Sequence, residues 1–229
     1  TGCVNSFSQQ ISVFEYNTEF TVSSNTVCVG ESVSFQDQST GGANSWLWTF
    51  GNGASSSSQN PTISYPSPGT YDVTLTSQNT VTGCSDNFSQ TIEVLPLPMP
   101  SFTGTPTIGC DPLVVDFTNT STGTGTFEWT FGNGNTFTGQ NPPDQTYVST
   151  GNYTVSLTFT DENGCVNTVT QNNYIQVEPL IANFEADVVE GCEDLEVQFT
   201  DLSSSPNATD NPITGWEWDF GYGNTFSGV

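Results

Sequence analysis

Six cysteines are the residues of this chain best suited to covalent chemistry. None belongs to a Cys-x-x-Cys pair and the chain contains no histidine, so the ligand sets typical of zinc sites are missing. Cysteines spread along a chain in this way are typical of a disulfide framework in an exported protein. The disulfide candidates are Cys3, Cys28, Cys84, Cys110, Cys165 and Cys192.

Acid–base and nucleophilic catalysis lack their usual groups in this sequence. Histidine and lysine, the commonest general base and Schiff-base nucleophile, are both absent. The carboxylates of Asp161 and Glu162, and of Glu193 and Asp194, fall in predicted turns, where we expect solvated acids. The sequence therefore predicts no catalytic residues and a chain that is not an enzyme.

The charge of the chain excludes several classes of partner. Lysine and arginine are absent and acidic residues number 24, which gives a net charge of −24. Nucleic-acid binding depends on basic side chains that neutralise phosphates, so we expect no nucleic-acid partner. An anionic membrane surface would repel the chain, and no apolar run is long enough to span a bilayer, so direct membrane insertion is not expected.

A motif that occurs three times organises the chain. It reads WLWTFGNG at residues 46–53, FEWTFGNG at residues 127–134 and WEWDFGYG at residues 216–223. Its tryptophans are 81 and 89 residues apart, which indicates a tandem array of one small domain. We predict the closing strand of a preceding repeat at residues 1–14, complete repeats at 15–97 and 98–180, and the N-terminal part of a further, truncated repeat at 181–229.

The segments between these motifs are typical of β-strands. Residues 32–39 (SVSFQDQS), 113–121 (LVVDFTNTS) and 153–160 (YTVSLTFT) alternate apolar and polar side chains and are rich in Val, Thr, Phe and Tyr. No stretch has the pattern of an amphipathic helix. Six or seven short strands per repeat predict an all-β chain of tandem immunoglobulin-like antiparallel β-sandwiches, joined by short linkers.

The motif itself is expected to build the core of each sandwich. The central tryptophan and the phenylalanine two residues later point to the same face of a strand. The Gly-Asn-Gly that follows supplies the positive-φ positions of a tight turn. The predicted core rings are Trp48, Phe50, Trp129, Phe131, Trp218 and Phe220.

The pattern W-x-F-G-x-G, followed by a Gly-Thr/Asn-Tyr-x-Val-x-Leu strand, resembles the PKD domain, the β-sandwich repeat first described in polycystin. The family's usual turn is W-D-F-G-D-G; Thr49 and Thr130 replace its first Asp, and only Asp219 restores it. The cysteines are similar to those of PKD repeats in large secreted or cell-surface proteins of Bacteroidota-type bacteria. This resemblance implies an exported, adhesive or stalk-like multidomain chain without an enzymatic activity of its own.

An immunoglobulin-like strand order bears on how the cysteines pair. It places the early and late cysteines of one repeat at opposite ends of a strand, about 25 Å apart, whereas a disulfide needs Cα atoms within about 7 Å. We therefore favour bonds between neighbouring repeats, Cys28 to Cys165 being the pair that this chain holds complete. The intra-repeat pairs Cys28–Cys84 and Cys110–Cys165, and free thiols, are the alternatives.

Calcium is the one cofactor that the composition would allow, because carboxylates and loop carbonyls are its preferred ligands. The second repeat is nearly uncharged in the equivalent segment, so solvated charge is the alternative reading. The candidates at the start of the third repeat are Glu185, Asp187, Glu190, Glu193 and Asp194.

Two functions from different classes fit these observations. In the first, the chain is a structural segment of a long extracellular cell-surface filament, stalk or adhesin, which contacts neighbouring repeats and self-associates laterally or end to end. In the second, it is a non-catalytic binding or spacer module of a secreted enzyme acting on polysaccharide or protein, and exposed aromatics such as Tyr222 and Phe226 would stack on sugars. Regular repeats, short proline-rich linkers and uniform negative charge favour the first function. A surface glycan or protein ligand is not identified by the sequence.

Overall fold

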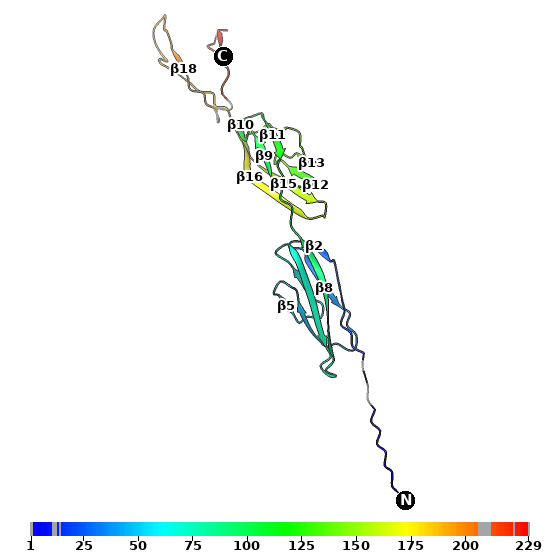
Figure 1. The fold of residues 1–229 in the computed structure, drawn as a ribbon. Coiled ribbons are helices and arrows are strands. Elements are labelled where there is room, and N and C mark those ends of the chain that lie inside the picture. Colours follow the sequence, from blue (N-terminus) through cyan, green and yellow to red (C-terminus); the bar gives the residue numbers. More distant parts are fainter. Residues whose placement is uncertain (1, 11–12, 14, 206–211, 222, 229) are drawn as a thin grey trace. The chain divides into compact units, whose positions relative to one another are not determined.

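A computed structural model of the chain describes residues 2–10, 13, 15–205, 212–221 and 223–228. The chain divides into two compact units, Thr1–Leu97 and Pro98–Val229, whose strands are shown in Figure 1. None of the described residues is helical, and so this part of the chain has no helix able to cross a membrane. The all-β prediction is confirmed.

The first repeat is a sandwich of two sheets. A three-stranded sheet has the order β1-β3-β6, and a five-stranded sheet has the order β2-β8-β7-β4-β5. β2 runs parallel to β8, whereas the other pairs are antiparallel. The strands are β1 Phe20–Val22, β2 Thr26–Cys28, β3 Ser32–Asp37, β4 Ser45–Thr49, β5 Ser55–Ser56, β6 Thr62–Ser64, β7 Gly69–Gln78 and β8 Ser85–Leu95.

The second repeat has the same topology. Its sheets have the orders β14-β11-β9 and β10-β16-β15-β12-β13, and β10 again runs parallel to the last strand, β16. A β-bulge shifts the register of β15 against β16 between Tyr153 and Val155. The strands are β9 Phe102–Thr105, β10 Ile108–Cys110, β11 Leu113–Asn119, β12 Gly125–Thr130, β13 Thr136–Thr138, β14 Gln145–Tyr147, β15 Gly151–Asp161 and β16 Val166–Glu178.

Alternating side chains of both sheets meet in one aromatic core per repeat. Trp48 stacks on Phe50 with ring centroids 6.3 Å apart, and Trp129 stacks on Phe131 at 5.8 Å. All four rings are at most 2% exposed. Each tryptophan also satisfies its indole N–H with a backbone carbonyl, Trp48 Nε1 donating to Ser58 O (2.9 Å) and Trp129 Nε1 to Gly139 O (3.1 Å). The core therefore buries large rings without leaving this donor unpaired.

A buried tyrosine closes each core from the three-stranded sheet. The Tyr147 hydroxyl donates to Phe131 O (3.0 Å), and the Tyr65 hydroxyl, just past β6, donates to Phe50 O (3.2 Å). Both tyrosines are at most 1% exposed. Each hydrogen bond ties the two sheets together at the point where the Gly-Asn-Gly turn begins.

The first glycine of that turn is required by both its conformation and its surroundings. Gly132 has a φ of +77°, and a Cβ added there would lie 2.6 Å from the backbone oxygen of Thr154. Gly134 has a φ of +93° but nothing within 4 Å of such a Cβ. The close approach of the turn to β15 therefore selects glycine at the first position more strongly than at the second.

Residues 179–228 contain two separate strand pairs. β17 (Phe184–Ala186) pairs with β18 (Phe199–Asp201), and β19 (Trp216–Asp219) pairs with β20 (Thr225–Gly228). The described residues of this repeat include no counterpart of the long hairpin β7–β8 or β15–β16. Its rings consequently lack the strands that cover the core in the complete repeats.

Candidate functional site

The two cysteines of the first repeat lie at opposite ends of its last strand. Cys28 pairs with Leu95, the final residue of β8, in the parallel ladder. Cys84 directly precedes Ser85, the first residue of β8, and its carbonyl accepts a hydrogen bond from Asn79 N (2.8 Å) in the β7–β8 turn. An eleven-residue strand separates the two ends by about 34 Å, which is far beyond the reach of a disulfide.

The second repeat places its cysteines in the same way. Cys110 pairs with Glu178, the last residue of β16. Cys165 lies in the β15–β16 turn, where its backbone N–H donates to Asp161 Oδ1 (2.9 Å) and its carbonyl accepts from Asp161 N (3.0 Å). Thirteen residues of β16 lie between the two positions.

Two of the six cysteines are disulfide-bonded, Cys28 and Cys165. Cys3 and Cys192 are free and exposed, and Cys84 and Cys110 are free and partly buried. The alternative intra-repeat pairings, Cys28–Cys84 and Cys110–Cys165, are therefore wrong, because each would join a bonded cysteine to a free one. The physical reason is the length of β8 and of β16, which hold the cysteines of one repeat apart.

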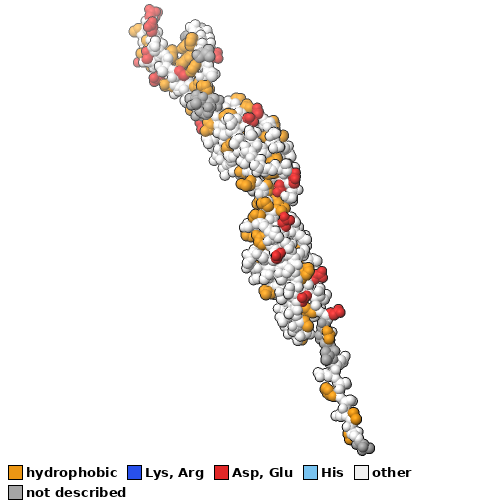
Figure 2. Space-filling view, viewed as in Figure 1, with side chains coloured by type: hydrophobic (Ala, Val, Ile, Leu, Met, Phe, Trp, Pro, Cys, Tyr) orange, Lys and Arg blue, Asp and Glu red, His pale blue; other side chains and the backbone are white. Residues whose placement is uncertain are grey.

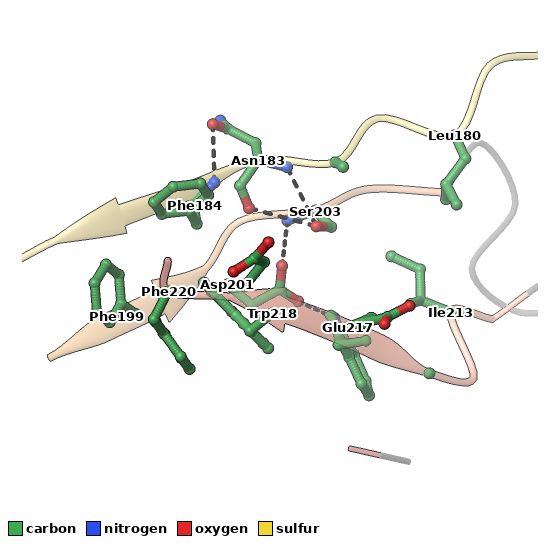
Figure 3. Close-up of a pocket in the computed structure, with 14 residues that line it drawn as sticks. Leu180, Asn183, Phe184, Phe199, Asp201, Ser203, Ile213, Glu217, Trp218 and Phe220 are labelled. Carbon is green, nitrogen blue, oxygen red and sulfur yellow. Dashed lines mark hydrogen bonds between the residues drawn. The ribbon is translucent and has the colours of Figure 1, made fainter. Parts of the chain in front are cut away.

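The third repeat carries an open groove of about 560 Å³. Figure 3 shows apolar side chains from all three labelled segments around it, with Leu180, Phe184 and Ile213 among them. Phe184 meets Trp218 edge-on at 5.4 Å, as Phe20 meets Trp48 (5.0 Å) in the first repeat. The groove is thus lined by the same rings that form the closed core of a complete repeat.

The exposure of these rings corrects part of the core prediction. Trp218 and Phe220 stack as expected, with centroids 6.0 Å apart and ring planes 9° apart. Phe220 is nevertheless 46% exposed, whereas Phe50 and Phe131 are at most 2% exposed. The difference arises because no described strand of the third repeat occupies the place of β7–β8. An apolar groove of this kind can bind an apolar strand but offers no reactive group.

A carboxylate–indole pair fixes one edge of the first sandwich. Trp46 Nε1 donates to Asp37 Oδ2 (2.7 Å), and Gln59 Nε2 donates to the same oxygen (3.1 Å). Partial burial raises the pKa of Asp37, but the hydrogen bonds from Ser39, Gln59 and Trp46 outweigh it, so the pKa lies below its ordinary value. Asp37 is therefore ionised at neutral pH and acts as an acceptor.

The same pair recurs in the third repeat and is replaced in the second. Trp216 donates to Asp201, whose pKa is lowered by hydrogen bonds from Ser203. In the second repeat Asn119 and Phe127 occupy these positions, and Asn119 Nδ2 is buried without a hydrogen-bond partner among the described residues. Loss of the indole donor is thus accompanied by loss of the charged acceptor.

Burial also shifts the two core tyrosines. Desolvation, with a smaller contribution from Tyr71, raises the pKa of Tyr65 to about 12. Desolvation and then Tyr153 raise the pKa of Tyr147 further. Both hydroxyls therefore stay protonated as hydrogen-bond donors to the core, and neither is poised for acid–base chemistry at neutral pH.

The acidic side chains do not converge on a site. Among the described residues, no group of three or more His, Cys, Asp or Glu is placed to hold a metal ion, which includes the candidate calcium ligands of residues 185–194. Asp187 instead accepts hydrogen bonds from Val188 N and Gln198 N, each 2.8 Å. Figure 2 shows the carboxylates scattered over the visible surface, separated by uncharged side chains. Such solvated, dispersed charge does not form a cation cage.

Sequence reasoning missed three structural features that the repeats share. The parallel pairing of β2 with β8 depends on long-range register and has no local pattern. The Asp37–Trp46 bond could have been suspected, because an Asp or Asn stands at the end of the same strand in all three repeats. The exposed Phe226 (60%) lies on β20, and Tyr222 falls outside the described residues, so stacking on sugars rests on one placed ring.

Comparison with known proteins agrees with this architecture. The model of the PKD domain family matches residues 18–95 and residues 97–177. The pre-pro-metalloprotease PrtV of Vibrio cholerae serotype O1 is 35% identical over 130 residues, which are 55% of this chain and 14% of that protein. This chain thus spans about one seventh of the relative's length, and the metalloprotease name describes the relative.

Solved structures of single domains are also similar. The PKD1 domain of the V. cholerae metalloprotease PrtV is 39% identical, with 34% of this chain and 95% of that chain covered and a TM-score of 0.31. The PKD1 domain of Vibrio anguillarum Epp is 32% identical, with 34% and 92% covered and a TM-score of 0.31. Because the two tandem family matches take in more than half of the sequence, this chain belongs to the PKD domain family.

Proposed function

We propose that this chain is a non-catalytic structural segment of a long extracellular, cell-surface stalk or filament built from PKD repeats. The observation that carries the proposal is the use of the distinctive residues for the repeats themselves. The rings of Trp48, Phe50, Trp129 and Phe131 are buried in two separate cores. The two complete repeats thus have their aromatic residues engaged in folding rather than in a shared pocket.

The linker composition supports an extended role. Pro96, Pro98 and Pro100 alternate with Leu97 and Met99 between the complete repeats. Alternating prolines restrict the backbone to extended conformations and make a linker a semi-rigid spacer. A chain of sandwiches with such spacers transmits position over a distance, which is the task of a stalk.

Charge supports the same role. Every ionised side chain at neutral pH is an acid, and the net charge is −24. Like charges repel over about 8 Å at physiological ionic strength, so they disfavour collapse of a chain onto itself and non-specific clustering of chains. The partners under this proposal are neighbouring repeats, with end-to-end or lateral contacts between chains and an unidentified ligand at the tip.

A second function is favoured by one specific observation. The relative with 35% identity is a pre-pro-metalloprotease, and this likeness supports a non-catalytic spacer or binding module in a secreted multidomain enzyme. Both functions place the repeats outside the cell and give them no chemistry of their own. They differ in what the repeats carry.

Fractionation of the producing culture distinguishes the two functions. An antibody fragment raised against residues 98–178 would be used to follow the chain in washed cells, sheared surface material and clarified medium. We expect it in sheared, high-molecular-weight material without hydrolytic activity on protein or polysaccharide. Co-purification with a soluble hydrolase in the medium, with none in the sheared fraction, would contradict the stalk and support the module.

A further inference from the structure

The two disulfide-bonded cysteines belong to different repeats. Cys28 lies in the first compact unit and Cys165 in the second. We propose that they are bonded to each other, so that one disulfide staples the first repeat to the second. The positions of the two cysteines within their own repeats carry this inference.

Cys28 is fixed where the chain leaves the first repeat. It is paired with Leu95 in the β2–β8 ladder, and Val29 N donates to Leu95 O (3.0 Å). Its own N–H donates to Glu31 Oε2 (2.7 Å), and it is 7% exposed. Adjacent strands are about 4.8 Å apart, so the Cys28 backbone lies next to the last residue before the linker.

Cys165 is fixed where the chain starts the second repeat. It sits in the β15–β16 turn, held by its two hydrogen bonds with Asp161. Two residues later, Asn167 Nδ2 donates to Pro98 O (2.9 Å). Pro98 is the first residue of the second unit, so this turn lies beside the far end of the same linker.

The linker is short enough to hold these two positions near each other. Leu95 and Pro98 are three residues apart, and three Cα–Cα steps span at most about 11 Å. Cys28 neighbours the first of these residues and Cys165 is two residues from a contact to the second. A disulfide requires Cα atoms about 4.4–6.8 Å apart, a separation that this short connection permits.

The remaining cysteines do not compete for either partner. Cys3, Cys84, Cys110 and Cys192 are all free. Cys84 lies at the other end of β8 from Cys28, and Cys110 lies at the other end of β16 from Cys165. Within one chain, the bonded state of Cys28 and Cys165 is accounted for by the pair itself.

Formation of the staple removes two protons and two electrons from the two thiols. Thiol–disulfide exchange with an oxidised dithiol supplies the oxidant, which leaves as a reduced dithiol. Cys110 occupies the place of Cys28 in the second repeat, and Cys84 occupies the place of Cys165 in the first. Each complete repeat thus presents one cysteine at each end, matched to a cysteine of a further repeat of the same kind.

A non-reducing peptide map of the full 229-residue chain tests the pairing directly. The chain would be oxidised with glutathione disulfide, its free thiols blocked with N-ethylmaleimide, and the protein cut with proteases specific for acidic residues, because it offers trypsin no site. We expect a linked peptide containing Cys28 and Cys165. The other four cysteines are expected to carry the maleimide.

Matched variants and isotope mixing complete the test. Cys28→Ser and Cys165→Ser should each abolish the linked peptide, whereas Cys84→Ser and Cys110→Ser should leave it unchanged. A Cys28–Cys84 or Cys110–Cys165 peptide, or full alkylation of Cys28 and Cys165, would overturn the proposal. A linked peptide joining a ¹⁴N chain to a ¹⁵N chain, with no ¹⁴N–¹⁴N excess over random pairing, would also overturn it. A stalk and an accessory module could both contain this bond, so its failure leaves the proposed function standing.

Discussion

The Asp37–Trp46 hydrogen bond is best tested by converting the first repeat to the residues of the second. Asp37→Asn and Trp46→Phe together give the pair that Asn119 and Phe127 form naturally. The single change Trp46→Phe removes the donor 2.7 Å from an ionised carboxylate. The double change removes the charge as well, and so it should cost less than the sum of the single changes.

The expected energies follow from the surroundings of the pair. A hydrogen bond to a charged group contributes about 1.5–3 kcal/mol, and we take the lower half of that range because Asp37 is only partly buried and keeps other donors. We expect Trp46→Phe to lower the free energy of unfolding of the first repeat by about 2 kcal/mol and Asp37→Asn by about 1 kcal/mol. The double variant should lose about 2 kcal/mol, which gives a coupling of about 1 kcal/mol.

Native-state hydrogen exchange reads out each repeat separately. Amides of Val73 and Leu75 in β7 report the first repeat, and those of Val155 and Leu157 in β15 serve as the internal control. A coupling of about 1 kcal/mol corresponds to about a fivefold difference in exchange rate. Because the lowered pKa of Asp37 stabilises the fold above its ordinary value of 3.8 and this stability is lost as pH falls through the folded pKa, the coupling should shrink near pH 2. Strictly additive single variants at pH 7 would refute the reasoning.

Three further predictions concern the core, the turn and the linker. Tyr65→Phe should cost about 1 kcal/mol at pH 7, because Phe50 O loses its donor; the wild-type stability conferred by the raised pKa of Tyr65 is present below pH 10 and lost as pH rises through about 12, so urea titrations at pH 7 and 11 should show a smaller loss in the variant, and equal losses would count against it. Gly134→Ala should lower the stability of the second repeat by about 1–2 kcal/mol through backbone strain alone, while Gly132→Ala, whose Cβ would meet Thr154 O, should lower its melting temperature further; equal effects would contradict the packing of the turn. Residual dipolar couplings of the two complete repeats should fit one alignment tensor in the oxidised chain and two tensors after Cys28→Ser, and two tensors in both samples would argue against a stapled pair.

Much of the fold could be predicted because its signals are local. The alternation in residues 113–119 and the Trp-x-Phe pairs fix which faces of the strands are buried, and the Gly-Asn-Gly turns fix where the strands end. The sequence could not predict β5, a two-residue strand of serines that is defined only by pairing with Trp48 and Thr49. The bulge of β15 against β16 likewise depends on how the two strands meet.

The cysteines show where local reasoning ends. Strand length alone excludes a bond between the two cysteines of one repeat, because it separates Cys28 from Cys84 whatever the details of packing. The bonded or free state of each thiol depends on the surroundings of the linker, which periodicity does not encode. Exposure of Phe220 was also missed, because the motif is the same in all three repeats and only the covering strands differ.

Cryo-electron microscopy of native producing cells and their sheared surface material tests the central claim most directly. β15 has eleven residues and is therefore about 37 Å long, so a thread of these repeats should show beads spaced by about 40 Å along its length. An antibody fragment against residues 98–178 should decorate such threads. If the antibody instead labels only compact soluble particles, and no threads carry it, the chain is not part of a stalk.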